Sequence, residues 1–124
     1  MQLKDQLIWL NLANTNIDDS ALIKIGQLQN LIKLDLSNTL ITDKGVMYLK
    51  DLSNLQYLKL VNTKITVTGI TLLKKSKKLH SLYLHKTGLI PKDLTVLKSL
   101  FPKANIDTGG YKLIRLSSDT ILLK

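Results

Sequence analysis

Leucines recur along this chain at a spacing of 24 residues, and the spacing of apolar positions changes halfway through each repeat. Each copy carries the pattern Leu-x-x-Leu-x-Leu-x-x-Thr-x-Ile/Leu, and the copies begin at Leu7, Leu31, Leu55 and Leu79. The first half of a repeat alternates apolar and polar residues as a strand does, and the second half places apolar residues three apart as a helix does. The pattern therefore predicts one strand and one helix in every repeat.

Residues suited to helix starts and to turns recur with the same spacing. Asp18, Thr42 and Thr66 stand where a helix N-cap is expected, and Pro91 suits the first helical position of the fourth repeat. A column of threonines is expected to bond backbone groups of the turns: Thr15, Thr39, Thr63 and Thr87. Because one strand and one helix cannot bury their apolar faces alone, the repeats are predicted to stack on one another.

These leucine and threonine columns resemble the leucine-rich repeats, and the resemblance covers residues 1–110. It implies an α/β fold, a right-handed horseshoe-shaped solenoid of 24-residue repeats. Short parallel strands would line its concave face and helices its convex face. Proteins of this kind bind other molecules on a surface and carry no built-in chemistry.

Several phrases are also similar to repeats that follow a c-type cytochrome domain in certain bacterial proteins. The phrases are Leu36 to Thr39 with Ile41 to Gly45, Leu82 to Leu84, and Phe101 to Gly109. Covalent haem attachment needs Cys-x-x-Cys-His, and this chain has no cysteine. The resemblance therefore implies haem chemistry upstream in a longer protein, located in the periplasm or outside the cell. The residues themselves indicate no cofactor and no compartment.

Both ends of the chain depart from the repeat. We expect residues 1–110 to form four full units and a degraded fifth rung, with a truncated first unit, and residues 111–124 to form a capping hairpin or tail. Residues 7–13 would then be an uncovered edge strand, and such edges pair readily with other chains. Either a preceding domain of a longer protein covers this edge, or a partner chain does. A homodimer would form through residues 7–13 or through the C-terminal tail.

The strand register identifies a candidate binding face. Side chains alternate along a strand, so the third, fifth and seventh positions of each repeat point away from the leucine core. Tyrosine and tryptophan on such a face are typical anchors for a partner. Asp35 and Lys59 are neighbours in the fifth-position column and are expected to pair across strands. The candidate binding residues are Trp9, Lys33, Asp35, Tyr57, Lys59, Tyr83, His85 and Asp107.

Charge and hydropathy narrow the classes of partner. The net charge of +9 would suit a polyanion, but the lysines gather near predicted helix ends, where the helix dipole favours cations. No aromatic residues interleave with the cluster from Lys74 to Lys78, as they would in a single-strand binder. The sequence thus argues against nucleic acid as a partner. No apolar run reaches the length of about 18 residues that a membrane-spanning helix needs.

Catalysis and metal binding find little support in the residue types. The chain has no cysteine and no glutamate, and its histidines, His80 and His85, are predicted to diverge. Ser81, His85 and Asp107 would lie on an open sheet without an oxyanion hole. We therefore expect a non-catalytic protein-protein interaction module within a larger bacterial protein. The alternatives are an accessory domain of a haem-bearing electron-transfer protein and a unit that assembles with itself edge to edge.

Overall fold

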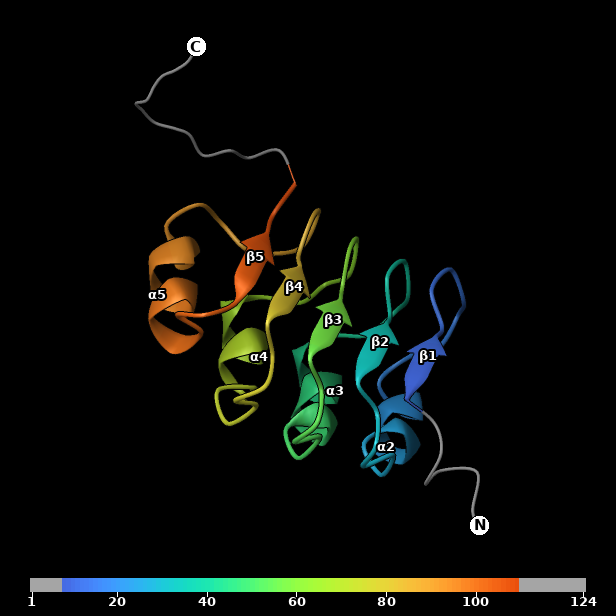
Figure 1. The fold of residues 1–124 in the computed structure, drawn as a ribbon. Coiled ribbons are helices and arrows are strands. Elements are labelled where there is room, and N and C mark those ends of the chain that lie inside the picture. The colour runs from blue at the N-terminus through green and yellow to red at the C-terminus, as the bar shows by residue number, and fades with distance from the viewer. Residues whose placement is uncertain (1–7, 110–124) are drawn as a thin grey trace.

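Strands and helices alternate along the part of the chain that the computed structural model describes, residues 8–109 (Figure 1). The strands are β1 (Trp9–Asn11), β2 (Lys33–Asp35), β3 (Tyr57–Lys59), β4 (Ser81–Tyr83) and β5 (Asn105–Asp107). The helices are α2 (Ala21–Ile25), α3 (Asp43–Val46) continued by the 3-10 helix η1 (Met47–Leu49), α4 (Val67–Thr71) and α5 (Asp93–Leu100). Each repeat thus forms the predicted strand and helix.

The strands form one parallel sheet in the order β1-β2-β3-β4-β5. The register joins residues that are 24 apart, so Lys33 lies between Trp9 and Tyr57, and Lys59 lies opposite Tyr83. The predicted columns are therefore confirmed. In Figure 1 the helices form a second row along one side of the sheet.

Leucines of the repeat columns fill the space between the sheet and the helices. Leu34, Leu58 and Leu82 are fully buried at the centres of their strands. The corresponding Leu10 in β1 is only partly buried and packs against the edge of the core. Burying a leucine side chain contributes about 1.5–3 kcal/mol, so the regular column is the main source of stability in this fold.

The helix starts follow the sequence prediction in two repeats and depart from it in two. Thr42 and Thr66 are N-caps whose hydroxyls accept hydrogen bonds from Lys44 N and Thr68 N. Asp18 was expected at the N-cap, but α2 begins at Ala21, since the Asp18 carboxylate instead closes a turn with Ser20 N at 3.0 Å. Pro91 likewise precedes α5, which begins at Asp93.

The threonine column has the structural role predicted for it. Each hydroxyl donates to the carbonyl oxygen three residues earlier, at 2.7–2.9 Å, and so closes the turn that leaves the strand. Thr39 and Thr63 are buried there.

Two further expectations concern segments outside the described residues. The predicted hairpin or tail at residues 111–124 lies there, and so does the start of the predicted edge strand at residue 7. Among residues 8–109, no helix is long and apolar enough to cross a bilayer.

Candidate binding surface

Two tyrosines stand next to each other on the face of the sheet that points away from the helices, which we call the open face. Tyr57 in β3 and Tyr83 in β4 are diagonal neighbours, and their ring centroids lie 5.1 Å apart with the planes tilted by 43°. Aromatic pairs favour tilted arrangements at this separation. Both side chains are half-buried, so the pair is held in place and remains partly accessible.

A lysine from the preceding strand covers each tyrosine ring. The Lys33 Nζ lies 5.7 Å from the centroid of Tyr57, and the Lys59 Nζ lies 5.7 Å from the centroid of Tyr83. Cation–π contacts of this length are worth about 0.5–1 kcal/mol at exposed sites. We call Lys33, Tyr57, Lys59 and Tyr83 the tyrosine-lysine cluster. The register brings these predicted residues together, because each lysine stands directly opposite the tyrosine that it covers.

The environment of Tyr57 changes its acidity. Burial raises the pKa of Tyr57 above its usual value of 10.0, and the nearby Tyr83 and Asp35 add to the rise. Each of these causes disfavours the charged phenolate. Tyr57 therefore presents a neutral hydroxyl, which can both donate and accept a hydrogen bond.

The predicted ion pair between Asp35 and Lys59 is wrong, although the two residues are register neighbours. The Lys59 ammonium lies over the Tyr83 ring instead. The Asp35 carboxylate accepts a hydrogen bond from Ser37 N at 3.0 Å and so closes the end of its own strand. An aromatic face and a backbone N–H satisfy these two groups better than an exposed ion pair, whose contribution is commonly below about 1 kcal/mol.

His85 and Asp107 form a side-chain hydrogen bond, and no other acidic and basic side chains within residues 8–109 approach to 4.0 Å or less. Their Nε2 and Oδ1 atoms lie 2.9 Å apart, and the side chains are 36% and 43% exposed. The same Asp107 oxygen accepts a hydrogen bond from Gly109 N at 2.9 Å. Gly109 has a φ of 82°, and a Cβ there would lie 2.9 Å from the His85 ring, so only glycine fits this turn.

Trp9 lies apart from the tyrosines, on the edge strand of the described sheet. Its side chain is 60% exposed, and the neighbouring Ile8 is 56% exposed. Lys33 and Asp35 lie on β2, between the strand of Trp9 and the strand of Tyr57. The predicted residues thus form a central group, a His-Asp pair at one end and an exposed edge at the other.

An asparagine column that was not predicted from the sequence lies at the edge where the strands end. Asn14, Asn38 and Asn62 have positive φ values of 64°, 58° and 55°. Their amides bond in series, from Asn38 Nδ2 to Asn14 Oδ1 at 2.8 Å and from Asn62 Nδ2 to Asn38 Oδ1 at 2.7 Å. Asparagine tolerates the left-handed conformation better than most residues. Their spacing of 24 was the signal in the sequence that would have revealed this ladder.

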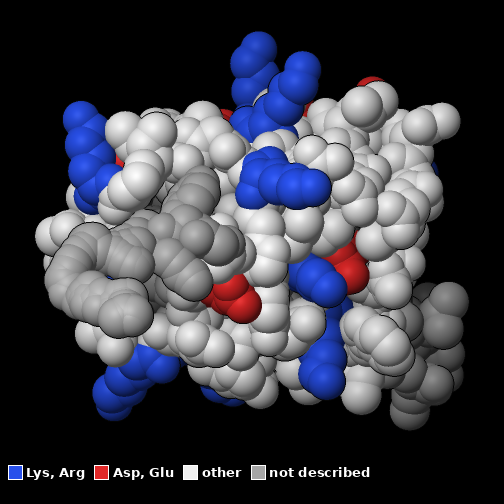
Figure 2. Space-filling model, turned by 90° about the horizontal axis from the view of Figure 1, so that it is seen from above, with Lys and Arg blue, Asp and Glu red and all other residues white. Residues whose placement is uncertain are grey.

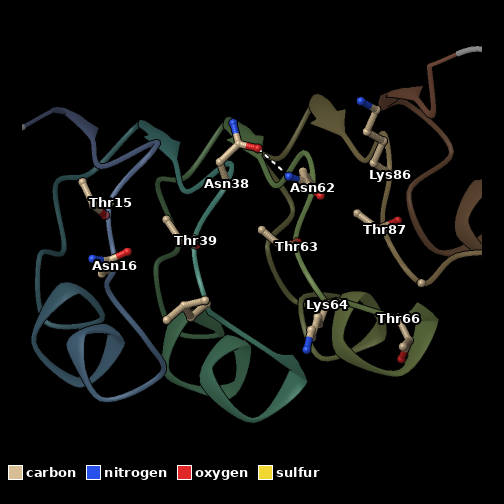
Figure 3. Close-up of a pocket in the computed structure, with 12 residues that line it drawn as sticks. Thr15, Asn16, Asn38, Thr39, Asn62, Thr63, Lys64, Thr66, Lys86 and Thr87 are labelled. Atoms are coloured by element: carbon tan, nitrogen blue, oxygen red, sulfur yellow. Dashed lines mark hydrogen bonds between the residues drawn. The ribbon is translucent and has the colours of Figure 1, made fainter.

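The ladder borders a shallow polar hollow of about 700 Å³, whose lining includes Lys64 and Lys86 (Figure 3). Figure 3 shows the Asn38–Asn62 bond crossing between two adjacent turns. Three threonines of the lining, Thr39, Thr63 and Thr87, donate to carbonyl oxygens three residues earlier in their own turns. We therefore assign this hollow to the scaffold.

Lysines are scattered over the face of the molecule that Figure 2 shows. Seen from above the ends of the strands, lysines stand at separate places among uncharged surface, and few acidic residues accompany them (Figure 2).

Within residues 8–109, no three histidine or aspartate side chains come close enough to hold a metal ion. His80 bonds its neighbour Ser81 through Nδ1 at 2.9 Å, away from the His85–Asp107 contact.

No family model matches the chain, and no curated protein matches it either. Among solved structures it is similar to the Chaetomium Mex67:Mtr2 subunits, with a TM-score of 0.60 and 19% identity over 93% of this chain and 85% of that one. Similarity to a Leptospira interrogans LRR protein has a TM-score of 0.48 and 21% identity, covering 83% and 37% of the two chains. Similarity to a Listeria monocytogenes internalin has a TM-score of 0.49 and 19% identity, covering 98% and 50%.

These similarities concern the fold. The chain spans half or less of the length of the Leptospira and Listeria proteins. The cytochrome resemblance gains no support from any of the three matches. A five-stranded parallel sheet alternating with helices, built on leucine columns in a 24-residue register, is what the repeat pattern predicts. The chain therefore has an α/β fold of the leucine-rich-repeat type.

Proposed function

We propose that this chain is a non-catalytic protein-binding module that holds its partner on the open face of the sheet. The observation that carries the proposal is the tyrosine-lysine cluster, in which two half-buried rings lie 5.1 Å apart and each carries a lysine at 5.7 Å. Tyrosine offers a large contact area with few rotatable bonds. Because the rings are already fixed by their neighbours, binding costs less conformational entropy.

The rest of the predicted site extends this centre. Asp35 and the His85–Asp107 pair add polar groups at its border, and Trp9 adds apolar surface at the far edge. Aromatic residues near the centre, with polar groups around them, are common in protein interfaces. An open sheet face suits a folded protein or an extended chain better than a small molecule, which favours an enclosed pocket.

The proposal is tested by site-specific photo-cross-linking in cells of the source organism. Benzoylphenylalanine in place of Ser81, which lies beside Tyr57 in the register, should give a discrete cross-linked band. The same group in place of Thr95, on α5, is the control and should not give that band. The double variant Tyr57→Ala/Tyr83→Ala should abolish the Ser81 cross-link while leaving the circular dichroism spectrum unchanged.

A cross-link of equal strength from Thr95 would place the partner on the helical side and refute the open face as the binding surface. Persistence of the Ser81 band in the double variant would show that the tyrosines do not anchor the partner. A band with the mass of a covalent dimer would identify a second copy of this chain as the partner. A haem-containing band would instead support the electron-transfer alternative.

A further inference from the structure

Ser76 replaces a leucine that belongs to the core. Counting by 24 residues, its position corresponds to Leu28, Leu52 and Leu100. Leu52 is fully buried, and Leu28 and Leu100 pack against the core. Ser76 is also buried, with 2% of its surface exposed. A short polar side chain therefore occupies a site that the fold shapes for a long apolar one.

The hydroxyl of Ser76 has no hydrogen-bond partner within the described part of the chain. Its backbone is well bonded, because Ser76 N donates to Leu73 O at 2.8 Å and Leu79 N donates to Ser76 O at 3.1 Å. The missing side-chain bond is thus not the result of a loose turn. Buried polar groups without a partner are rare in native proteins and destabilise them, so each one calls for an explanation.

A hollow of about 290 Å³ lies beside this serine. Its walls are apolar and come from the turn before β4 and from the end of α5: Leu79, Leu100, Phe101 and Pro102. Three lysines stand around it: Lys74, Lys77 and Lys103. None of the three makes an ion pair with another residue of the range 8–109. The hollow therefore combines an apolar wall, free positive charge and an unused hydroxyl.

We propose that this hollow binds a small ligand with an apolar body and a carboxylate. The apolar body lies against Phe101 and Leu100, in volume that a leucine at position 76 would partly fill. The carboxylate faces the lysine ammonium groups, which attract it without strict geometry. Ser76 lines the hollow, and its enclosed hydroxyl donates a hydrogen bond to a carboxylate oxygen after turning between staggered positions, which a serine does readily.

The ligand class has two common sources, a free short-chain acid and the carboxyl terminus of a peptide. Octanoate represents the first and N-acetylleucine the second. Octan-1-ol has a similar tail without charge, and inorganic phosphate has charge without a tail. The four probes are added separately to the full isotope-labelled chain, and the amide signals of residues 74–79 and 100–103 are followed by NMR.

We expect octanoate or N-acetylleucine to shift these signals and to saturate, and whichever acid binds more tightly identifies the source. Ser76→Leu fills the hollow and should abolish the shifts while raising the melting temperature. Ser76→Ala should weaken binding about tenfold, since a hydrogen bond to a charged group commonly contributes that much. Lys77→Gln and Lys103→Gln should each weaken it. The controls Ser53→Ala and Lys64→Gln, which change an exposed serine and a distant lysine, should leave it unchanged.

Three results would overturn the proposal. The first is that neither acid shifts these signals. The second is that the Ser76→Leu variant binds the acids as the natural chain does. The third is that octan-1-ol alone, or phosphate alone, binds as tightly as the acids. The test is independent of the open face of the sheet, because Ser81 cross-linking and binding beside Ser76 use different residues.

Discussion

Tyr57 is the residue whose ionisation most directly reports the packing of the open face. Its pKa is raised above 10.0 in the folded chain, first by burial and then by Tyr83 and Asp35. We predict that in an alkaline titration, followed by tyrosinate absorbance, one phenol ionises above the usual range. Tyr57→Phe should remove that high-pH step and leave the others in place.

The same shift has a defined consequence for stability. When a tyrosine has a higher pKa in the folded than in the unfolded state, the folded state favours the neutral phenol. The stabilisation that comes from this difference is present in full below about pH 10, the pKa of tyrosine in the unfolded chain, and is lost above it. As the pH rises through the unfolded and then the folded pKa, the free energy of unfolding falls. A Tyr57→Phe variant should lose less stability over this interval than the natural chain, and an equal loss would contradict the assignment.

Lys86 is the residue that breaks the asparagine ladder. It has a φ of 55° at the position that Asn62 occupies one repeat earlier, and a lysine is strained in this conformation by roughly 1 kcal/mol. We predict that Lys86→Asn raises the free energy of unfolding by about 1 kcal/mol, because asparagine tolerates the conformation and extends the ladder to Asn62. Chemical denaturation measures the change. Lys64→Asn, at an exposed site without positive φ, is the control and should not stabilise the chain.

At the scale of elements, successive helices are joined by a carboxylate that the sequence analysis did not identify. Asp19 accepts hydrogen bonds from Thr42 N at 2.7 Å and from Thr42 Oγ1 at 2.6 Å. One repeat later, Asp43 bonds Thr66 in the same way, at 2.8 Å and 2.5 Å. Each of these aspartates therefore fixes the start of the next helix. Val67 takes the corresponding position in the next repeat and cannot accept such bonds.

This arrangement explains why Gly45 and Gly69 are glycine. A Cβ at Gly45 would lie 2.3 Å from Asp19 Oδ1 and 2.7 Å from Leu22 Cδ1, and a Cβ at Gly69 would meet Asp43 in the same way. We predict that Gly45→Ala destabilises the chain by about 1–3 kcal/mol through overpacking. Lys44→Ala, at the neighbouring exposed position, should have little effect in the same denaturation assay.

A double-mutant cycle separates this clash from a general effect of alanine. Asp19→Ala alone should also destabilise, since it leaves Thr42 without its partner. In the Asp19→Ala background, Gly45→Ala should cost clearly less, because the carboxylate that it meets is absent. Additive costs would show that Asp19 is not the cause.

The elements of this fold were predictable because their determinants repeat. Leucine columns fix the strand register, and the threonine hydroxyls close each turn, so both follow from spacing alone. The bonds between repeats were harder to predict. Asp19 and Thr42 are 23 residues apart, and nothing in the local sequence indicates that Thr42 bonds a carboxylate from the turn before α2. The cation–π contacts were missed for a similar reason, since a charge pair between Asp35 and Lys59 is the simpler expectation from register.

At the scale of the whole molecule, regular stacking concentrates the departures from the pattern at particular places. Ser76 interrupts a leucine column, and Lys86 interrupts the asparagine column. Trp9 and Ile8 expose apolar surface at the edge of the described sheet. A stacked architecture needs identical contacts between neighbours for stability, so residues that depart from the column are those free to serve another purpose.

Strand β1 lies at the edge of the described sheet, and we predict that two copies of the chain associate there. An edge strand with unpaired backbone groups pairs readily with another chain, and Trp9 is 60% exposed beside it. We predict that the chain forms a dimer through β1, detected by sedimentation as a mass above the monomer value of 13.9 kDa that rises with protein concentration. Trp9 is the only tryptophan, so its emission should shift to the blue over the same range of concentration, as the indole leaves water.

Trp9→Lys tests the surface that is responsible, because a lysine on an edge strand opposes pairing through repulsion between like charges. The variant should remain monomeric at concentrations where the natural chain associates. Leu40→Lys is the matched control, since Leu40 is 62% exposed but lies between β2 and α3 and outside the edge strand. This variant should associate as the natural chain does. A natural chain that keeps the monomer mass and a constant emission maximum would exclude pairing through β1. A dimer that survives Trp9→Lys would place the contact on another surface.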